Sequence, residues 1–401
     1  MEKFWMKRVA LSTFSLAMLT GAGAAHAQSS VTLYGVIDES IQWAHNTTNS
    51  NAPSQNQNLV GMYGGNLSGN RWGLKGTEDL GGGLQAIFQL ESGFDINTGA
   101  AGQGGKMFGR QAFVGLASDR YGTLTLGRQY DPLVDMIQPL TGDNDFGSTF
   151  ATPGDVDNND NSSRTNNAIK YTSPLLDGFQ FEGLYALDGV AGSNGSGQSW
   201  GAAGTYAIGS FNIAAGYFMM DNASSLADRT GTDGTVGWAS GATSGAMFDS
   251  QINQAYASAK SVGTAAVAAQ YVTGPFTFAA RYSNVQLKAD GFSTFATTQR
   301  YNVAGGYFGY RVNPAVLLGL GYTYTHGSGN ASNTYNQVSL GADYNLSKRT
   351  DLYALAAYQH ANGQQPGAAS GVSAGASIGS YGYNSASSSQ ELVSLGIRHK
   401  F

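Results

Sequence analysis

Two overlapping Gly-x-Ser-x-Gly strings are the residues whose types and spacing come nearest to a catalytic motif. They are Gly371–Gly375 and a second run through Ser377 to Gly379. A nucleophile elbow of this form needs a strand before the serine, a helix after it, and an acid and a histidine later. Both strings lie in a tract of small residues, where such matches arise by chance, and only Glu391 and His399 follow. No enzyme is predicted, although spacing alone leaves open a hydrolase that joins Ser and His across strands.

A second set of residues has the spacing of oxygen ligands. The run Asp155-x-Asp157-x-Asn159-x-Asn161 begins like a calcium loop. An EF-hand would continue with Gly at the sixth position and Glu at the twelfth, where this chain has Asp160 and Asn166. Carboxylates and amides are hard donors, so the run permits loosely bound Ca²⁺, but a solvated or pore-facing loop is favoured. No cofactor is predicted.

Charge is concentrated in the stretch from Asp131 to Ser163, which carries seven aspartates and no lysine, arginine or glutamate. Basic groups facing it across a narrow water-filled gap would create a field that favours polar solutes and sets an ion preference. Alternatively, these charges only brace the stretch through salt bridges or lie in solvent. Which basic residues can face this acidic stretch depends on the secondary-structure elements before and after it.

Those elements alternate polar and apolar residues. Between Val316 and Thr325 the even positions are apolar, whereas the odd positions are Gly or Thr apart from Leu317. Such alternation places one set of side chains on each face of a β-strand. We predict sixteen strands, at 31–43, 69–77, 84–94, 108–117, 122–130, 166–172, 179–187, 199–207, 211–219, 264–272, 276–287, 299–311, 315–326, 335–346, 351–360 and 391–401.

The predicted strands favour a membrane barrel over a soluble sandwich. About ten residues of tilted strand cross roughly 25–30 Å of hydrocarbon. Tyr and Phe cluster near strand ends, and tight turns alternate with long polar links such as 131–165, 220–263 and 361–390. Only a closed barrel leaves no unpaired strand edge in lipid. The predicted fold class is therefore all-β, a transmembrane antiparallel β-barrel of sixteen strands.

Composition excludes several other classes. The 401 residues include 57 glycines, 8 prolines and no cysteine, and only 12% are charged. This composition argues against long helices, disulfide frameworks and thiolate metal sites. A net charge of −5, with 21 basic residues spread along the chain, argues against nucleic-acid binding.

Residues 1–27 have the pattern of a signal peptide. A basic beginning is followed by an apolar stretch from Val9 to about Leu19 and by the small–x–small site Ala25-His26-Ala27. The apolar stretch is shorter than the roughly 20 residues of a spanning helix. We therefore expect export through the inner membrane and a mature barrel domain at 28–401.

Several motifs resemble those of the general porins of Gram-negative bacteria. They are the opening Ser30–Gly35, the runs Gly73–Leu84, Phe108–Leu116 and Tyr121–Arg128, and the C-terminal strand that ends in Phe401. The resemblance covers the mature chain end to end. It implies a homotrimer in the cell outer membrane, in contact with lipid and lipopolysaccharide, that lets ions and small hydrophilic solutes diffuse passively.

The resemblance also implies a pore constriction. In such porins the third long loop folds into the lumen and faces basic residues of the wall, so residues 131–163 are expected to be the constriction loop. Arg71, Arg110 and Arg164 match the family's wall arginines, with two neighbours in the same lining. The expected wall residues are Arg71, Lys75, Arg110, Arg128 and Arg164. The expected loop residues are Asp131, Asp135, Asp143 and Asp145.

Strand parity supports part of this assignment. Arg71 and Lys75 share one parity opposite Trp72, and Arg164 shares the parity of Lys170, so these side chains should point inward. The family's Pro-Glu-Phe-Gly-Gly run is replaced by Gly142–Gly147, which leaves open which aspartates face the arginines.

Other outcomes stay open on the sequence alone. Wall arginines favour anions and the acidic stretch favours cations, so the sign of selectivity is undecided. The alternatives to a general porin are a solute-specific barrel channel, another outer-membrane barrel such as an adhesin or hydrolase, and a secreted soluble β protein.

Overall fold

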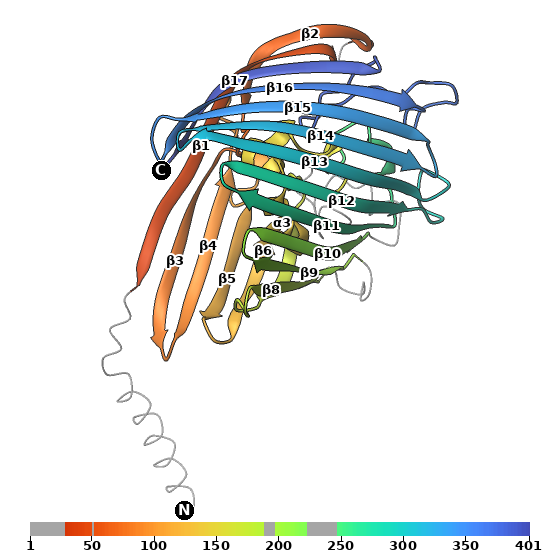
Figure 1. The fold of residues 1–401 in the computed structure, drawn as a ribbon. Coiled ribbons are helices and arrows are strands. Elements are labelled where there is room, and N and C mark those ends of the chain that lie inside the picture. The colour runs from red at the N-terminus through yellow and green to blue at the C-terminus, as the bar shows by residue number, and fades with distance from the viewer. Residues whose placement is uncertain (1–28, 50–51, 188–196, 223–246) are drawn as a thin grey trace, which may run out of the picture.

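A computed structural model describes residues 29–49, 52–187, 197–222 and 247–401, and the predicted signal peptide at 1–27 lies outside these ranges. Each strand pairs antiparallel with its neighbours, and β1 (Ser30–Asn49) closes the ring by pairing with β17 (Ser389–Lys400) (Figure 1). The other strands are β2 (Ala52–Gly64), β3 (Arg71–Gly81), β4 (Leu84–Gly93), β5 (Gln111–Ser118), β6 (Gly122–Gln129), β7 (Thr165–Thr172), β8 (Phe179–Ala186), β9 (Ser199–Ile208), β10 (Phe211–Asp221), β11 (Ser261–Thr273), β12 (Phe276–Lys288), β13 (Gln299–Asn313), β14 (Val316–Ser328), β15 (Asn333–Asn345) and β16 (Thr350–Gly363).

The strands fill sixteen positions around a closed barrel, because β2 and β3 share one. The first part of β1 pairs with β3 from Ser30 to Val36, and its later part pairs with β2 from Glu39 to Asn49. Both are antiparallel to β1, so they form one interrupted strand. All sixteen predicted strands are present. The sequence analysis missed β2, whose run of polar residues from Ser54 to Asn58 is exposed on both faces and shows no alternation.

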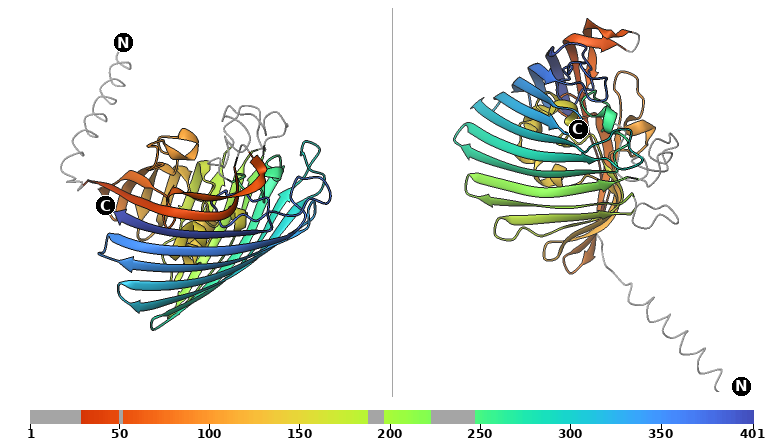
Figure 2. Two further views of the ribbon diagram at one scale, coloured as in Figure 1. Left: turned by 90° about the horizontal axis from the view of Figure 1, so that it is seen from above. Right: turned by 90° about the vertical axis from the view of Figure 1, so that its right-hand side faces the viewer.

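The predicted alternation sorts side chains onto the two faces of the wall. In β14, Leu318, Leu320 and Tyr322 are exposed on the outer face, whereas Leu317 and Thr323 on the other parity are buried. Figure 2 shows the strands as one continuous curved wall. The outer face is therefore the apolar one, as a bilayer requires.

Tight turns and long connections lie at opposite ends of the strands. Turns such as Gly274-Pro275 join strands at the end that holds both termini, whereas the long segments 94–110, 130–164 and 364–388 lie at the other end. The link 329–332 is short although it lies on the long-segment side. At the terminal end, the amide nitrogen and carbonyl oxygen of Gly35 and Phe401 bond reciprocally at 3.1 Å. Any side chain at Gly35 would overlap the Phe401 ring, so only glycine permits this close approach.

The helical pieces are short. They are α2 (Gly102–Gly105), α3 (Pro132–Met136), α4 (Asp143–Phe146) and the 3₁₀ turns η1 (Gln138–Leu140), η2 (Gly147–Thr149), η3 (Pro153–Asp155) and η5 (Gln254–Tyr256). None of the helices in the described ranges is long and apolar enough to cross a membrane.

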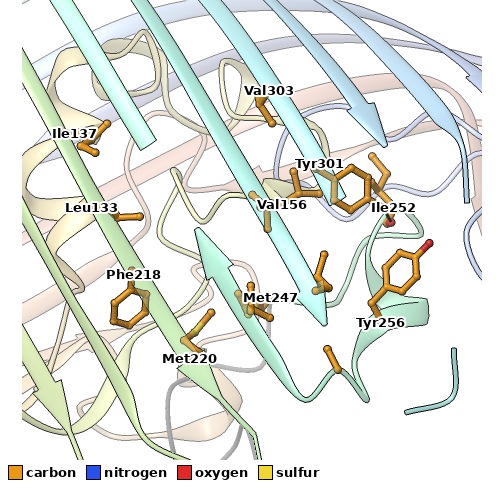
Figure 3. Close-up of a cluster of buried hydrophobic side chains, with 14 of the residues drawn as sticks. Leu133, Ile137, Val156, Phe218, Met220, Met247, Ile252, Tyr256, Tyr301 and Val303 are labelled. Atoms are coloured by element: carbon orange, nitrogen blue, oxygen red, sulfur yellow. Dashed lines mark hydrogen bonds between the residues drawn. The ribbon is translucent and has the colours of Figure 1, made fainter. Parts of the chain in front are cut away.

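A buried apolar cluster forms where connecting segments meet the wall. Leu133 from the segment after β6 lies near Phe218 of β10, and Ile252 lies near Tyr301 of β13 (Figure 3). Val156, also from the segment after β6, belongs to the same cluster. The Tyr301 hydroxyl donates to the Ile252 carbonyl oxygen at 2.5 Å. Apolar packing against the wall therefore fixes the segments that carry the candidate site.

Candidate functional site

The acidic segment 131–163 begins with a capped helix. The Asp131 carboxylate accepts hydrogen bonds from the amides of Leu133 at 2.8 Å and Val134 at 3.3 Å, and Pro132 occupies the first helical turn. This is the usual chemistry of a helix N-cap. Burial raises the pKa of Asp131 to about 6. Asp131 therefore has a structural position at the start of α3, which packs against β8, β9 and β10.

The middle of the segment is anchored by aromatic rings. Phe146 is fully buried, and its ring fills the space above Gly319 and Gly341, where a Cβ on either glycine would overlap it. These glycines belong to the inward parity of β14 and β15. Phe150 stacks on Phe146 with ring centroids 4.9 Å apart. Glycines on two neighbouring strands therefore form a recess for one aromatic side chain of the segment.

Polar contacts tie the segment to the wall at further points. The Tyr307 hydroxyl donates to Asp145 at 2.7 Å, and Arg281 pairs with Asp157 at 2.8 Å. Asp135 forms an ion pair with Lys170, which also lies 3.4 Å from Glu182. Three of the segment's aspartates are thus engaged by wall residues of β7, β12 and β13.

Three arginines gather on the other side, around one carboxylate. Glu91 of β4 accepts from Arg110 Nε at 2.8 Å and lies 3.7 Å from Arg71 Nε. The hydroxyls of Tyr34 and Tyr130 donate to the same carboxylate at 2.9 and 3.1 Å. Glu91 is almost fully buried, so three hydrogen-bond donors and two positive charges compensate its desolvation.

Arg164 completes this cluster without an acid of its own. Its guanidinium lies 5.7 Å from the centroid of the Tyr130 ring, which it shares with Arg110 at 5.8 Å. Its Nε is buried and donates to no described residue. Burial, together with the charges of Arg110 and Arg128, lowers the pKa of Arg164 to about 10. Two of the three arginine charges therefore have no dedicated counter-ion.

A cavity of about 930 Å³ joins the two sides. Its lining includes all three clustered arginines together with carboxylates of the acidic segment. The charged residues that line it are Arg71, Arg110, Arg164, Glu91, Asp95, Asp135, Asp143 and Asp160. Charges predicted to oppose one another across a gap thus share one water-accessible space.

The remaining predicted site residues lie outside that lining. Lys75 is exposed, with its Nζ 5.4 Å from the Tyr34 ring centroid. Arg128 Nε donates to the Gly109 carbonyl oxygen at 2.8 Å, so it braces the start of β5. Asp131 caps α3 and Asp145 bonds Tyr307, as described above.

Sequence reasoning missed several residues that organise the site: Glu91, Tyr130, Lys170 and Arg281. Each lies on or beside a predicted strand, where parity could indicate an inward side chain. Its partner comes from a segment far away in the sequence, and no local pattern identifies that partner.

Three neighbouring carboxyls of the acidic segment are buried together. The Asp155 carboxylate accepts from the amides of Asp160 at 2.9 Å and Ser162 at 3.1 Å. Burial, with repulsion from Asp160 and Asp157, raises the pKa of Asp155 to about 8. Burial and neighbouring carboxyls likewise raise the pKa of Asp143, and burial raises that of Asp160. These groups hold protons at a pH where exposed aspartates have lost them.

The predicted calcium-type run does not converge on one point. Asp155 bonds backbone amides, Asp157 pairs with Arg281, and Asn159 donates to Asp143 at 3.1 Å. Within the described ranges, no three His, Asp or Glu side chains form a group that could hold a metal ion. The oxygen atoms of this run bond within the segment and, through Asp157, to the wall.

The Gly-x-Ser-x-Gly strings lie in the connection between β16 and β17, with no helix after either serine. Ser377 is buried, and its hydroxyl bonds that of Ser250 at 3.1 Å. The geometry of a nucleophile elbow is therefore not formed there.

The barrel agrees with comparisons to known proteins. A family model described as "Gram-negative porin" matches residues 12–364. The chain belongs to the Gram-negative porin family. It is 32% identical over 395 residues to an outer membrane porin protein of Bordetella pertussis, covering 88% of this chain and 94% of that one.

Other relatives support the same assignment. A match to the major outer membrane protein P.IB of Neisseria gonorrhoeae has 27% identity over 348 residues and covers 83% of this chain and 89% of the other. Among solved structures, an anion-selective porin from Comamonas acidovorans superposes with a TM-score of 0.67 at 24% identity, covering 93% of this chain and all of that one. This porin is therefore an outer-membrane channel for passive diffusion of small hydrophilic solutes, and it is not an enzyme.

Proposed function

We propose that residues 131–163 are the constriction loop of this porin and that Arg71, Arg110 and Arg164 form the wall opposite. The cavity shared by these arginines with Asp135, Asp143 and Asp160 is the observation that carries the proposal. Contacts of Phe146 with inward-facing glycines support a position of the loop within the lumen. Asp131, Asp145, Lys75 and Arg128 hold the loop and wall in shape.

The charge balance favours anions. Glu91 compensates one of the three arginines, and Asp135 is paired with Lys170. Burial raises the pKa values of Asp143 and Asp160, so these carboxyls lose their protons at a higher pH than exposed aspartates do and oppose the arginines less strongly. Among the described ion pairs, Glu91 is the carboxylate that contacts Arg71 and Arg110, so the zone immediately around the three arginines carries net positive charge. A ring of positive charge admits anions more readily than cations. The Comamonas acidovorans porin with the same fold is itself described as anion-selective.

We further infer that the mature chain is a homotrimer. Six of the most exposed aliphatic side chains lie side by side on the outer faces of β17, β1 and β2. They are Val31, Leu33, Ile41, Val60, Met62 and Leu395, with exposures between 59% and 73%. A smooth aliphatic surface of this kind suits contact with another subunit, while the remaining outer wall suits lipid and lipopolysaccharide. Residues 1–27 act as the export signal that is removed.

A bilayer recording tests this function. The purified porin should insert in three equal conductance steps and show a chloride-selective reversal potential in a KCl gradient at neutral pH. Migration as a heat-modifiable oligomer in gels should accompany it. A potassium-selective reversal potential would contradict the proposed constriction, and single steps would contradict the trimer.

Selectivity should depend on pH between 5 and 9. Asp155 titrates at about pH 8, and the pKa values of Asp143 and Asp160 are also raised, so a rise in pH adds negative charge beside the arginines. Asp143 and Asp160 line the cavity together with the arginines, so we expect the chloride preference to fall as pH rises and to recover on return to pH 5. Reversal potentials measured across this range check the effect. A variant with Asp143, Asp155 and Asp160 replaced by Asn should show little change, and an equal response in that variant would contradict the assignment.

A further inference from the structure

The connection between β16 and β17 contains a run of residues that is buried although it lies in a link between strands. In the segment 364–388, six consecutive residues from Ala374 to Gly379 are buried. Their small size has a steric reason, because a Cβ at Gly379 would overlap the Ser148 carbonyl oxygen, and φ of Gly379 is +52°. The small-residue tract is therefore shaped for close approach to the segment 131–163.

A row of three glutamines lies beneath this tract. Gln337 of β15, Gln359 of β16 and Gln390 of β17 are register partners on successive strands, and all three belong to the inward parity. Each is 0–1% exposed. Three uncharged amides in one buried row need partners, because an unsatisfied buried amide is costly.

The partners are backbone groups of the tract. Gln359 donates to the Ser377 carbonyl oxygen and accepts from the Ser377 amide, both at 2.7 Å. Gln390 accepts from the Ile378 amide, and Gln337 accepts from the Gly379 amide, both at 2.9 Å. Backbone atoms of three consecutive residues are thus bonded by three consecutive strands.

Gln337 also connects the tract to the other segment. Its Nε2 donates to the carbonyl oxygens of Thr149 at 3.1 Å and Ala151 at 3.2 Å. Its Oε1 accepts from Gln359 at 3.0 Å as well as from Gly379. One side chain therefore holds both segments at the same place on the wall.

The two segments contact each other directly beside this row. The Gly154 amide donates to the Gly379 carbonyl oxygen at 2.7 Å. Hydroxyls from both segments, Ser148 and Ser380, donate to the same Asp160 oxygen. The segments form one packed unit whose attachment to β15, β16 and β17 depends on the glutamine row.

We propose that Gln337, Gln359 and Gln390 are positioning residues that hold the segment 364–388 against the segment 131–163, so that both segments together set the width of the channel. This inference rests on the proposed constriction. Removing the amides weakens the attachment of the small-residue tract, because its only large apolar side chain is Ile378, which packs with Ala357, Tyr381 and Leu392. The channel then widens, while the barrel wall, paired strand to strand, stays intact.

Replacing all three glutamines by Ala tests the inference. We expect single-channel conductance to rise about twofold, and larger sugars to enter in liposome-swelling assays. Gln299→Ala is the matched control, because Gln299 is equally buried and inward-facing but bonds Ala331 in the link 329–332. That control should conduct like the wild type.

A reversible disulfide between the two segments distinguishes a loss of segment position from a loss of folding. The chain has no cysteine, so Ser148→Cys with Ser380→Cys introduces a single pair. Oxidation should join the pair and leave wild-type conductance unchanged. In the triple glutamine variant, or in Gln359→Ala if the triple variant does not fold, oxidation should restore wild-type conductance and dithiothreitol should widen the channel again.

Two results would overturn the inference: a folded triple variant with wild-type conductance and exclusion limit, or a Cys pair that does not join on oxidation. Absence of any channel in the wild-type protein would instead overturn the proposed function, so the two failures are distinguishable.

Discussion

Arg71→Gln combined with Arg110→Gln should turn an anion-preferring channel into one that favours cations. At about 6 Å and an effective dielectric constant of about 40, one unit charge changes the energy of a passing ion by roughly 1.4 kcal/mol. This is about tenfold in the local concentration of each ion, in opposite directions, and therefore about a hundredfold in the ratio of anions to cations. Removing both charges leaves Glu91 as an uncompensated carboxylate beside the cavity. The reversal potential in a KCl gradient should therefore move strongly toward that of potassium.

A charge-neutral pair of substitutions provides the control for that experiment. Arg110→Gln together with Glu91→Gln removes one positive and one negative charge from the same buried contact, which measures 2.8 Å in the native chain. Selectivity should stay close to that of the wild type, because the net lining charge is unchanged. If both variants give the same reversal potential, the charge of the arginine cluster does not set selectivity.

Phe146→Ala should release the middle of the acidic segment. Truncating a fully buried phenylalanine lowers the free energy of unfolding by about 3–5 kcal/mol. In this chain the lost interaction is the contact of the Phe146 ring with Gly319 and Gly341. The barrel strands keep their hydrogen bonds, so the loss is local to the segment. We expect a rise in open-channel noise and in mean conductance, recorded on single channels.

Phe278→Ala is the matched comparison for the loop anchor. Phe278 is 47% exposed on the outer face of β12, and its removal leaves the interior unchanged. Its conductance and noise should equal those of the wild type. Quiet, wild-type openings in the Phe146 variant would mean that the ring does not anchor the segment.

Period-two alternation made the wall predictable, because each strand must satisfy lipid on one face and water on the other along its whole length. All sixteen predicted strands are present, and the family assignment from the motifs between Ser30 and Arg128 is confirmed. β2 lacks that constraint. The polar run of β2 pairs with the end of β1 beyond the alternating part, so no alternation of polar and apolar residues predicted this strand.

The candidate site divides in the same way. Sequence by itself determined the barrel, the inward parity of Arg71 and the density of carboxylates between Asp131 and Ser163. These features depend only on the local order of residues and on composition, which can be read without knowledge of the fold. Only the tertiary structure decided that Asp131 caps a helix, that Asp157 pairs with Arg281, and which carboxyls share a cavity with the arginines. The reason is physical. The partner of a charged side chain lies on a strand or segment that is distant in the sequence, and the energy of the ion pair depends on the distance between the charges and on their burial. Strand periodicity encodes neither quantity.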